Sequence, residues 1–556
     1  AGETLYVAAY SSSKIGIFNT RELENGTFTP SEDNHIEVSG GGPAGIALDE
    51  SRDRMYVLTR FNNSVAVIDL NEGRETQSVA MYNPEPDYIT EGRPFLYDAR
   101  FSSGRGDSSC GSCHLFGDMD GLAWELGNPD GVTTENPRGY VNFFMEMNAL
   151  PVHHPLKGPM LTQSFRGMDF QGPLHWRGDK TGTYQVAGES LEHAAFKEFR
   201  GAFTELLGRA EEPTEDEMNK FADFVMQMRY PPNPNRNLDD TLTAEAEFGA
   251  NIYFNQKTTG FEAEKTGNVA MITCNDCHEV DPEIERFGTS TLMSFEGTEV
   301  SQDMKVAHLR NVYTRIGMYG LKLRKRTSTA TEMGPQVTGF GLSHDGAIDT
   351  LENFLSLNVF HVDTPDIPEV MEYVTQIPTG LAPIVGQQAT FNLTSQSDAA
   401  LVSTMMAQAL AHTFDSSVRK QKCDLIANGV IGGEERAWRF VDTGANTGSF
   451  VDMHGDASSF NRLRWTSLIP GNSITFTCAA PGSGERLAFD RDEDGIYNLA
   501  DAETSGRKPT SVQSPDPDAE PVQVERAAGA FWREESQKNS GIFPDFDHFW
   551  AFDFFN

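Results

Sequence analysis

A five-residue pattern that occurs twice constrains this chain more than any other feature. Two cysteines stand three positions apart with a histidine directly after the second, at residues 110–114 (CGSCH) and again at residues 274–278 (CNDCH). This C-x-x-C-H spacing is the attachment signature of c-type haem, in which both thiols form thioethers and the adjacent imidazole is the proximal iron ligand. We therefore expect two covalently bound haem c groups. Their attachment residues would be Cys110, Cys113, His114, Cys274, Cys277 and His278.

Two other interpretations of a C-x-x-C pair are weaker. A thioredoxin-like redox dithiol does not require the trailing histidine, and a zinc site would need a further cysteine pair nearby. Haem c is attached outside the cytoplasm, so we expect a periplasmic or an extracellular, cell-surface location. In such an oxidising compartment Cys423 and Cys478 would form a disulfide, the alternative being two separate buried thiols.

The charge of the chain limits its partners. Lys and Arg number 44 while Asp and Glu number 81, which gives a formal net charge of −37. Nucleic acids and anionic lipid surfaces need a cationic protein surface, so both are excluded as partners. The sequence holds no run of about 18 apolar residues, so we expect no transmembrane segment. A small basic redox protein is the expected electron donor or acceptor.

An internal repeat marks the N-terminal region, residues 1–80. Apolar segments at residues 5–7 and 15–19 recur at residues 55–57 and 65–69, at a constant offset of 50 positions. Apolar runs separated by polar turns predict β-strands, and a repeat of this length is typical of β-propeller blades. Two blades cannot close a ring, because a propeller needs at least four. Either upstream blades are absent from this chain or these strands cap the region that follows.

Two helical regions are expected around the two motifs, at residues 81–235 and 236–382. Apolar periodicity predicts one helix over 215–229, and a second helix begins near residue 244, ahead of the second motif. The Pro-rich residues 231–234 would form a linker between them. The recurring order of helix, C-x-x-C-H and loops suggests two lobes related by duplication.

The C-terminal region divides into two parts. Residues 383–504 combine a helical segment at 398–412 with short strands, which predicts a small α+β domain. Residues 505–556 form a Pro-, Ser- and Asp-rich linker followed by an aromatic, acidic tail. The tail either packs on its own domain or docks on a partner or a second copy, since exposed aromatic side chains are costly. A homo-oligomer or a surface assembly is compatible with both this tail and the blades.

Residues 490–501 (DRDEDGIYNLAD) follow the spacing of a twelve-residue calcium loop. Carboxylates at positions 1, 3 and 5 converge on one hard cation, and glycine at position 6 permits the sharp turn. The alternative is an acidic turn without a metal. The expected calcium ligands are Asp490, Asp492, Asp494, the carbonyl of Ile496, and Asp501.

Segments after each motif connect the chain to a known family. Residues 174–179 (LHWRGD) follow the first motif, and residues 305–312 (KVAHLRNV), 344–346 (HDG) and 350–352 (TLE) follow the second. In these segments the chain resembles the bacterial diheme cytochrome c peroxidase and MauG superfamily, over residues 95–378. The whole arrangement is similar to a larger subgroup with YVTN-type β-propeller blades before the haems and a calcium-type loop after them. The resemblance implies two mainly α-helical cytochrome c lobes.

The resemblance also assigns site residues. In the family a bridging Trp lies between the haems, and Trp176 matches it; the alternative is a buried core Trp. A distal His precedes a Gly-Pro on the first-haem side, and both His153 and His154 match that place, the alternative being an exposed loop pair.

The second haem departs from the family at its sixth ligand. The family places a Met fourteen residues after the HDG histidine, where this chain has Asn358, a poor iron ligand. His361, His344 and Met318 are the candidate sixth ligands. Ligation by histidine would lower the reduction potential relative to Met ligation.

The resemblance implies a peroxidase that reduces hydrogen peroxide at the first haem, with electrons relayed from the second haem through Trp176. Glu189, Glu192 and His193 are loose candidates for proton delivery, against the alternative that they are surface groups. A pure electron-transfer diheme cytochrome is one alternative function, favoured by the spare histidines. A MauG-like or rubber-oxygenase-like diheme oxidase is the other.

Overall fold

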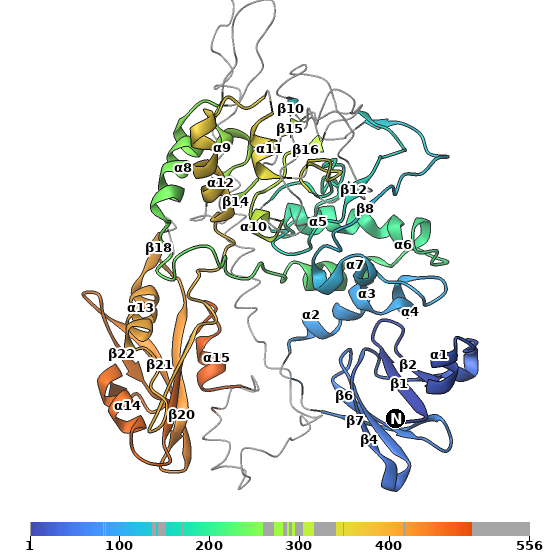
Figure 1. Cartoon of the computed structure of the whole chain (residues 1–556), viewed down its shortest axis with the longest axis horizontal. Coiled ribbons are helices and arrows are strands. Elements are labelled where there is room, and N and C mark those ends of the chain that lie inside the picture. The colour runs from blue at the N-terminus through green and yellow to red at the C-terminus, as the bar shows by residue number, and fades with distance from the viewer. Residues whose placement is uncertain are drawn as a thin grey trace, which may run out of the picture.

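The computed structural model describes residues 2–491 and residue 497, apart from residues 82, 84, 136–140, 143–151, 170, 259–271, 282–285, 289–291, 295–303, 316–340, 349, 358 and 415–418. This part of the chain is multidomain and mixes helices with several mainly antiparallel sheets, in agreement with the mixed fold class expected from the sequence (Figure 1). The boundaries expected near residues 80, 235, 382 and 504 stay predictions. The linker and aromatic tail at 505–556 lie outside the described residues.

Two antiparallel sheets form the N-terminal region. The strands are β1 (Thr4–Ala9), β2 (Lys14–Asn19), β3 (His35–Glu37), β4 (Pro43–Asp49), β5 (Arg54–Thr59), β6 (Ser64–Asp69) and β7 (Arg74–Ala80). The first three strands form one sheet and the other four form the second. The β1–β2 hairpin and the β5–β6 hairpin lie 50 residues apart, so the repeat is one of structure as well as of sequence. Within the described residues these are two sheets, fewer than a propeller needs, and the propeller interpretation stays a prediction.

Short helices surround the first motif. They are α2 (Asp87–Thr90), α3 (Arg93–Tyr97), α4 (Ala99–Ser102), α5 (Leu191–Lys197), α6 (Gly201–Glu205) and α7 (Glu215–Val225). Helix α7 begins with a reciprocal capping box, in which Thr214 accepts the backbone N–H of Glu217 at 3.2 Å and Glu217 accepts that of Thr214 at 2.7 Å. It ends four residues before its predicted end, because the N–H of Met228 bonds the carbonyl of Val225 and tightens the last turn.

A second set of helices surrounds the second motif. They are α8 (Ala244–Asn255), α9 (Cys274–Cys277), α10 (Val312–Arg315), α11 (Leu351–Leu355) and α12 (Ile367–Thr375). Helix α8 begins after its cap Thr243, as predicted, and packs along α12. Gly249 permits this packing, because a Cβ there would lie 1.9 Å from the carbonyl oxygen of Glu369.

The segment at 231–234 connects these two sets of helices. The sequence predicts a simple linker here, yet Asn233 is 1% exposed. Its side-chain amide donates to the carbonyls of Thr375 and Ile377, both at 2.9 Å. The segment is therefore fastened to the end of α12, since a buried amide is stable only with its hydrogen bonds made.

Short strands connect the loops around the two motifs. They are β8 (Ala123–Trp124), β9 (Thr134–Glu135), β10 (Val141–Asn142), β11 (Val152–His153), β12 (Met160–Leu161), β13 (Val280–Asp281), β14 (Arg286–Phe287), β15 (Leu292–Ser294) and β16 (Met304–Lys305). Strand β10, after the first motif, pairs with β15, after the second motif, so the two regions share a small sheet.

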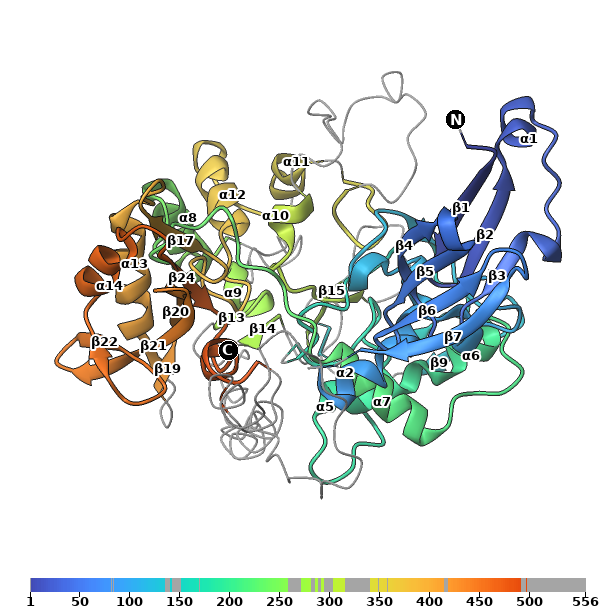
Figure 2. The same ribbon diagram turned by 90° about the horizontal axis from the view of Figure 1, so that it is seen from below.

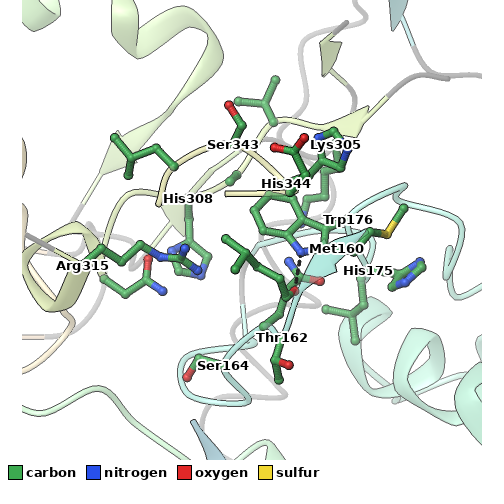
Figure 3. Close-up of a pocket in the computed structure, with 18 of the residues that line it drawn as sticks. Met160, Thr162, Ser164, His175, Trp176, Lys305, His308, Arg315, Ser343 and His344 are labelled. Atoms are coloured by element: carbon green, nitrogen blue, oxygen red, sulfur yellow. Dashed lines mark hydrogen bonds between the residues drawn. The ribbon is translucent and has the colours of Figure 1, made fainter. Parts of the chain in front are cut away.

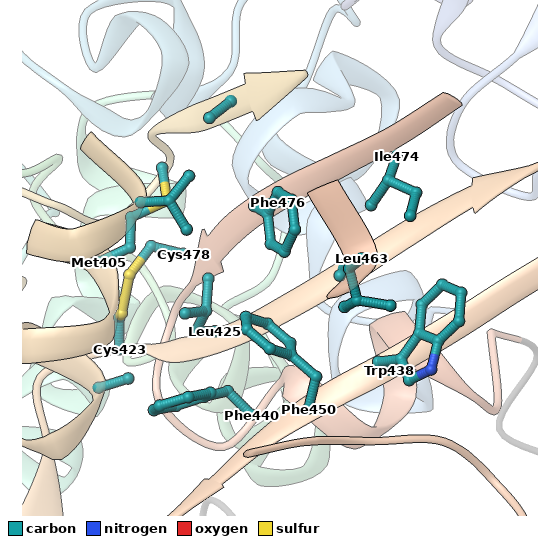
Figure 4. Packing of buried hydrophobic residues seen from close by; sticks show 14 of the residues in the cluster. Met405, Cys423, Leu425, Trp438, Phe440, Phe450, Leu463, Ile474, Phe476 and Cys478 are labelled. Atoms are coloured by element: carbon teal, nitrogen blue, oxygen red, sulfur yellow. A yellow bond between two sulfur atoms is a disulfide. The ribbon is translucent and has the colours of Figure 1, made fainter. Parts of the chain in front are cut away.

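A six-stranded sheet with the order β17-β24-β20-β21-β22-β23 forms the C-terminal region, which confirms the α+β expectation. Its elements are β17 (Gln388–Asn392), α13 (Ala399–Leu410), β20 (Asp424–Ile431), β21 (Glu434–Gly444), β22 (Thr447–Val451), β23 (Ala457–Ser458), α14 (Phe460–Ser467), β24 (Ser473–Ala479) and α15 (Gly484–Ala488), with the separate hairpin β18 (His412–Phe414) and β19 (Arg419–Gln421). The predicted disulfide between Cys423 and Cys478 is present in its core (Figure 4).

The two terminal regions lie at opposite ends of the molecule. The N-terminal sheets lie beside the helices of the first motif and the six-stranded sheet lies beside those of the second (Figures 1 and 2). Lys422 bonds the carboxylate of Asp240 at 2.6 Å, and the same carboxylate binds Arg236 at 2.8 Å, so charge pairs join the C-terminal region to the segment before α8. Of the helices in the described ranges, none is both long enough and apolar enough for a bilayer crossing.

Candidate functional site

Both C-x-x-C-H motifs open into one cavity. Its volume is about 2570 Å³, well above the ~300–1,000 Å³ of ordinary small-molecule pockets. All four cysteines and both histidines of the motifs lie in its wall. The cavity can therefore hold two large groups, one beside each motif.

Each motif folds as one capped turn. Cys110–Ser112 forms a 3-10 turn after Ser109, and Cys274–Cys277 forms α9 after Thr273, each with a capping box. Gly111 in the first motif lies against α3, where a Cβ would come within 2.7 Å of the ring of Tyr97. The Ser112 hydroxyl accepts the N–H of Ser109 at 3.0 Å, and the Thr273 hydroxyl accepts that of Asp276 at 3.2 Å. These bonds hold each turn, so the two thiols of each motif point from a fixed backbone.

The two motif histidines are held in the same way. Nδ1 of His114 bonds the backbone carbonyl of Gln163 at 2.8 Å, and Nδ1 of His278 bonds that of Ala307 at 2.7 Å. A carbonyl only accepts, so Nδ1 carries the proton and Nε2 keeps its lone pair. Burial lowers the pKa of His114 to about 4, which keeps that ring neutral. Each ring is thus oriented as a metal ligand by a bond to the main chain.

The four motif thiols are not poised as a redox dithiol. None of these four cysteines forms a disulfide, and burial raises the pKa of Cys110 and of Cys277 to about 12, with a raised pKa at Cys113 as well. Reactive C-x-x-C pairs instead have a lowered thiol pKa. The described ranges also hold no cluster of three or more potential metal-binding His, Cys, Asp or Glu side chains.

The part of the cavity beside the first motif is called its first half, and the part beside the second motif its second half. Two crossed hydrogen bonds join these halves. The N–H of Leu161 in β12 donates to the carbonyl of His344 at 2.7 Å, and the N–H of Lys305 in β16 donates to the carbonyl of Trp176 at 2.7 Å. Strand β12 leads to Gln163, which anchors the first motif histidine, and β16 leads to Ala307, which anchors the second. A strand of each half therefore bonds to the equivalent loop of the other half, so the arrangement is approximately symmetric.

The loops that receive these bonds share one conformation. Leu174 pairs with Lys180 and Leu342 pairs with Ile348, each as an isolated antiparallel bridge. His175 and Ser343, the residues after each leucine, have left-handed φ values of 74° and 69°. The next positions are Trp176 and His344, so the same loop presents an indole in one half and an imidazole in the other.

Trp176 lies between the two halves. It is 8% exposed and packs with Met160, Leu161 and Met304. Its indole Nε1 donates to the carbonyl of Leu161 at 2.8 Å, drawn as the dashed line in Figure 3. The ring is thus fixed by β12 while its own carbonyl holds β16 through Lys305.

A buried acid and a buried base occupy the same region. Burial raises the pKa of Glu192 to about 7, and Glu192 accepts the N–H of Gly172 at 2.9 Å. Burial lowers the pKa of Lys305 to about 7, against the charge of Glu192, which raises it. Lys305 lies in the cavity wall (Figure 3). Burial therefore brings the pKa values of these two side chains together, near neutrality.

The histidines expected as distal residues or as sixth ligands do not all lie at the cavity. His153 is 2% exposed, with its pKa lowered to about 4 by burial, whereas His154 is exposed and accepts the N–H of Leu156. Neither is among the residues that line the cavity. Of the candidate sixth ligands, His344 is buried in the cavity wall and His361 is exposed. Met318 lies outside the described residues.

Two of the residues expected to deliver protons, His193 and Glu189, do not line the cavity. His193 Nδ1 pairs with Glu189 at 2.6 Å, and this pair lies outside the cavity wall. Sequence reasoning missed a second pair, of which the histidine lines the cavity: Nδ1 of His175 bonds Asp179 at 2.5 Å. The signal for it is the alignment of residues 174–180 (LHWRGDK) with residues 342–348 (LSHDGAI), which shows where the two halves differ.

The calcium loop is described only at its start and at residue 497. Asp490 follows α15, Arg491 lies 3.7 Å from Glu435, and Tyr497 donates to Glu485 at 2.8 Å. The other expected ligands, Asp492, Asp494, Ile496 and Asp501, lie outside the described residues, so the calcium site stays a prediction.

Comparison with known proteins identifies no family for this chain. No family model matches the chain, and no curated protein matches it. Among solved structures, it is similar to a chain of Kuenenia stuttgartiensis hydrazine synthase pressurized with 20 bar xenon, with a TM-score of 0.33 and 16% identity, covering 52% of this chain and 88% of that one. A similarity at this level assigns neither a fold family nor an activity.

Proposed function

We propose that this chain is an exported diheme c-type cytochrome and a redox enzyme of the cytochrome c peroxidase type. It would reduce hydrogen peroxide in the part of the cavity beside the first motif, with electrons relayed from the second motif through Trp176. The observation that carries the proposal is that both C-x-x-C-H motifs open into one cavity, with both histidines anchored alike.

The residues of each motif fit haem c. Each motif offers two thiols outside any disulfide for thioether formation, and one imidazole that its Nδ1 bond orients as an iron ligand. Cys110, Cys113 and His114 would hold the first haem, and Cys274, Cys277 and His278 the second. When bound, the haems supply the one-electron redox chemistry that the protein side chains lack.

The asymmetry between the two halves supports a reaction site at the first motif. The second half presents His344 in the cavity wall, and we propose it as sixth ligand of the second haem. The equivalent residue of the first half is Trp176, whose indole is turned to the carbonyl of Leu161 and offers no ligand nitrogen. At this position the first half therefore offers no protein ligand, and we propose that a substrate binds there instead.

Trp176 is well placed to relay electrons. It belongs to the loop of the first half, and its carbonyl accepts the N–H of Lys305 from the second half. A rigid indole in van der Waals contact with residues of both halves shortens the path between the two haems. Met160 from the first half and Met304 from the second half belong to the same buried cluster.

A ligand-binding spectrum tests the proposal. Purified protein is titrated with cyanide and with hydrogen peroxide while the haem absorption is followed. A shift in about half of the haem absorption supports an open site at one haem. Two low-spin haems that ignore both ligands would favour the pure electron carrier. Consumption of O₂ without added peroxide would favour a MauG-like or rubber-oxygenase-like oxidase.

Location and partners follow from the same proposal. The Cys423–Cys478 disulfide is compatible with an exported protein. The net charge of −37 favours a basic redox protein as electron donor, because complementary charge steers encounter.

A further inference from the structure

We propose that His175 and Asp179 form an acid–base pair that moves the proton of an oxidant held beside the first motif. This inference rests on the function proposed above. His175 would be the catalytic residue, since it is one of the residues that line the cavity. Asp179 would be a positioning residue that acts through His175.

The pair is built for this task. Nδ1 of His175 donates to Asp179 at 2.5 Å, and both side chains are less than one-fifth exposed, at 18% and 17%. The bond takes up Nδ1, so Nε2 is the nitrogen left for a ligand in the cavity. The ring of Phe199 meets the imidazole edge-on at 6.1 Å and limits its rotation.

Surrounding charges keep the carboxylate ionised. Arg177 lies 3.6 Å and Lys180 lies 4.0 Å from Asp179. Burial alone would raise the pKa of Asp179, but His175, Lys180 and Arg177 together hold it well below its usual range. Burial lowers the pKa of His175 against the opposing effect of Asp179, with Lys157 and Arg177 lowering it further. The imidazole is therefore neutral near pH 7 and ready to accept a proton.

The second half shows that the loop does not need this pair to fold. The equivalent residues are Ser343 and Ala347, and the loop keeps the same bridge and the same left-handed turn. A histidine and an aspartate at those two places are thus an addition to the first half alone. A largely buried, ionisable pair that the backbone does not require indicates chemistry rather than structure.

The proton transfer balances for hydrogen peroxide. Nε2 of His175 takes the proton from one oxygen and returns it to the other, the O–O bond breaks, and the doubly protonated oxygen leaves as water. The second oxygen becomes water by taking two protons from solvent and two electrons from an external one-electron donor through the proposed haems. His175 ends the cycle as it began, so it is a catalyst and not a reactant.

Hydrogen cyanide is the probe, because it must lose its proton as it binds. Its association rate is measured near pH 7 by stopped flow in the haem-loaded protein. The double variant His175→Ser/Asp179→Ala installs the pair that the second half carries. We expect association to slow by about 100-fold, the lower range of general-base contributions. Asp179→Asn alone should slow it less, because the ring is still present.

His193→Gln is the matched control. His193 also pairs with a carboxylate four residues away, Glu189 at 2.6 Å, in the same half but outside the cavity wall. This variant should bind cyanide within about twofold of wild type. If the double variant does not fold, His175→Gln replaces it, since an amide keeps a bond to Asp179 but is a far weaker base.

The outcomes are distinct. A wild-type protein that ignores cyanide overturns the proposed function and this inference with it. A wild-type protein that binds cyanide while the double variant, or His175→Gln, binds it at the same rate overturns this inference alone. Equal slowing in His193→Gln would also overturn it, because the effect would then not belong to the cavity.

Discussion

The backbone N–H of Lys305 donates a 2.7 Å hydrogen bond to the carbonyl oxygen of Trp176. Leu161 makes the matching bond to His344, also at 2.7 Å. Each of these bonds joins a strand of one half to a loop of the other half. A buried backbone group without its hydrogen bond costs about 1–3 kcal/mol, so each half needs the other to satisfy these groups. The motif histidines are anchored two residues after these strands, at Gln163 and Ala307, so they share this coupling.

Trp176→Phe should slow electron transfer between the two proposed haems without causing the loss of either haem. Phenylalanine keeps the packing against Met160 and Met304 but is harder to oxidise and loses the bond to Leu161. Electron transfer from the second to the first centre should slow by about tenfold or more, equivalent to at least ~1.4 kcal/mol of barrier. Stopped-flow reduction followed by peroxide addition measures that rate.

Trp124→Phe is the control for this prediction. Trp124 also lies in the cavity wall, but its Nε1 donates to Asp120 at 2.9 Å and the side chain is 40% exposed. Its replacement should leave the transfer rate unchanged. Equal rates in Trp176→Phe and wild type would remove Trp176 from the electron path.

Glu192→Gln should flatten the dependence of stability on pH. Burial raises the pKa of Glu192 to about 7 in the folded chain, whereas a free Glu titrates near ~4.3. As the pH rises, the unfolded chain releases this proton first, so the folded state loses stability through pH 7. Between about pH 5.5 and pH 8.5 the loss is on the order of 2 kcal/mol.

Urea unfolding of wild type and Glu192→Gln at the two pH values measures this difference. The wild type should lose stability relative to the variant as the pH rises, and Gln should keep the bond from Gly172. Parallel pH curves for the two proteins would show that Glu192 is ionised in the folded chain across this range.

Gly167→Ala should weaken the contact between the two halves. Gly167 has a left-handed φ of 63°, and a Cβ there would lie 2.8 Å from Arg310 and from Tyr230. The Arg310 guanidinium donates to the Gly167 carbonyl, so any shift also disturbs that bond. Strain and overpacking together should lower the free energy of unfolding by about 3 kcal/mol.

Gly106→Ala separates strain from crowding in the same experiment. Gly106 has a φ of 69°, yet a Cβ added there would meet no heavy atom within 4 Å. It should cost only the backbone strain, about 1 kcal/mol. Equal losses at Gly106 and Gly167 would mean that the Arg310 contact does not resist a side chain.

Removing the disulfide should destabilise the C-terminal region. Cys423 and Cys478 are fully buried and 55 residues apart. Closing a loop of that length stabilises by about 4 kcal/mol in the chain-entropy model. Cys423→Ala/Cys478→Ala should lower the unfolding free energy by that order, measured in urea. A loss below about 1 kcal/mol would mean that the loop is already constrained in the unfolded chain.

Local features of this fold were predictable from the sequence. The caps Thr214, Thr243 and Asp398 each precede a helix where the pattern placed one. The 50-residue repeat predicted the two matching hairpins, and the cysteine count predicted the disulfide. Each of these signals is carried by side chains close in sequence or by chemically distinctive ones.

The arrangement of the site was harder to predict, because main-chain groups build much of it. The carbonyls that anchor the motif histidines belong to Gln163 and Ala307, two residues with no chemistry in common. The loops at residues 174–180 and 342–348 share a conformation but only two identical residues, a leucine and a glycine. The left-handed backbone conformation of His175 could not be predicted from the sequence either, because a residue other than glycine rarely adopts it.

Mass spectrometry of the denatured chain tests the central claim most directly. The protein is produced in a host that matures c-type cytochromes, then denatured and weighed. The account predicts a mass that exceeds the polypeptide by two haems, and by one haem in Cys110→Ala/Cys113→Ala. A wild-type mass equal to the bare polypeptide would contradict it.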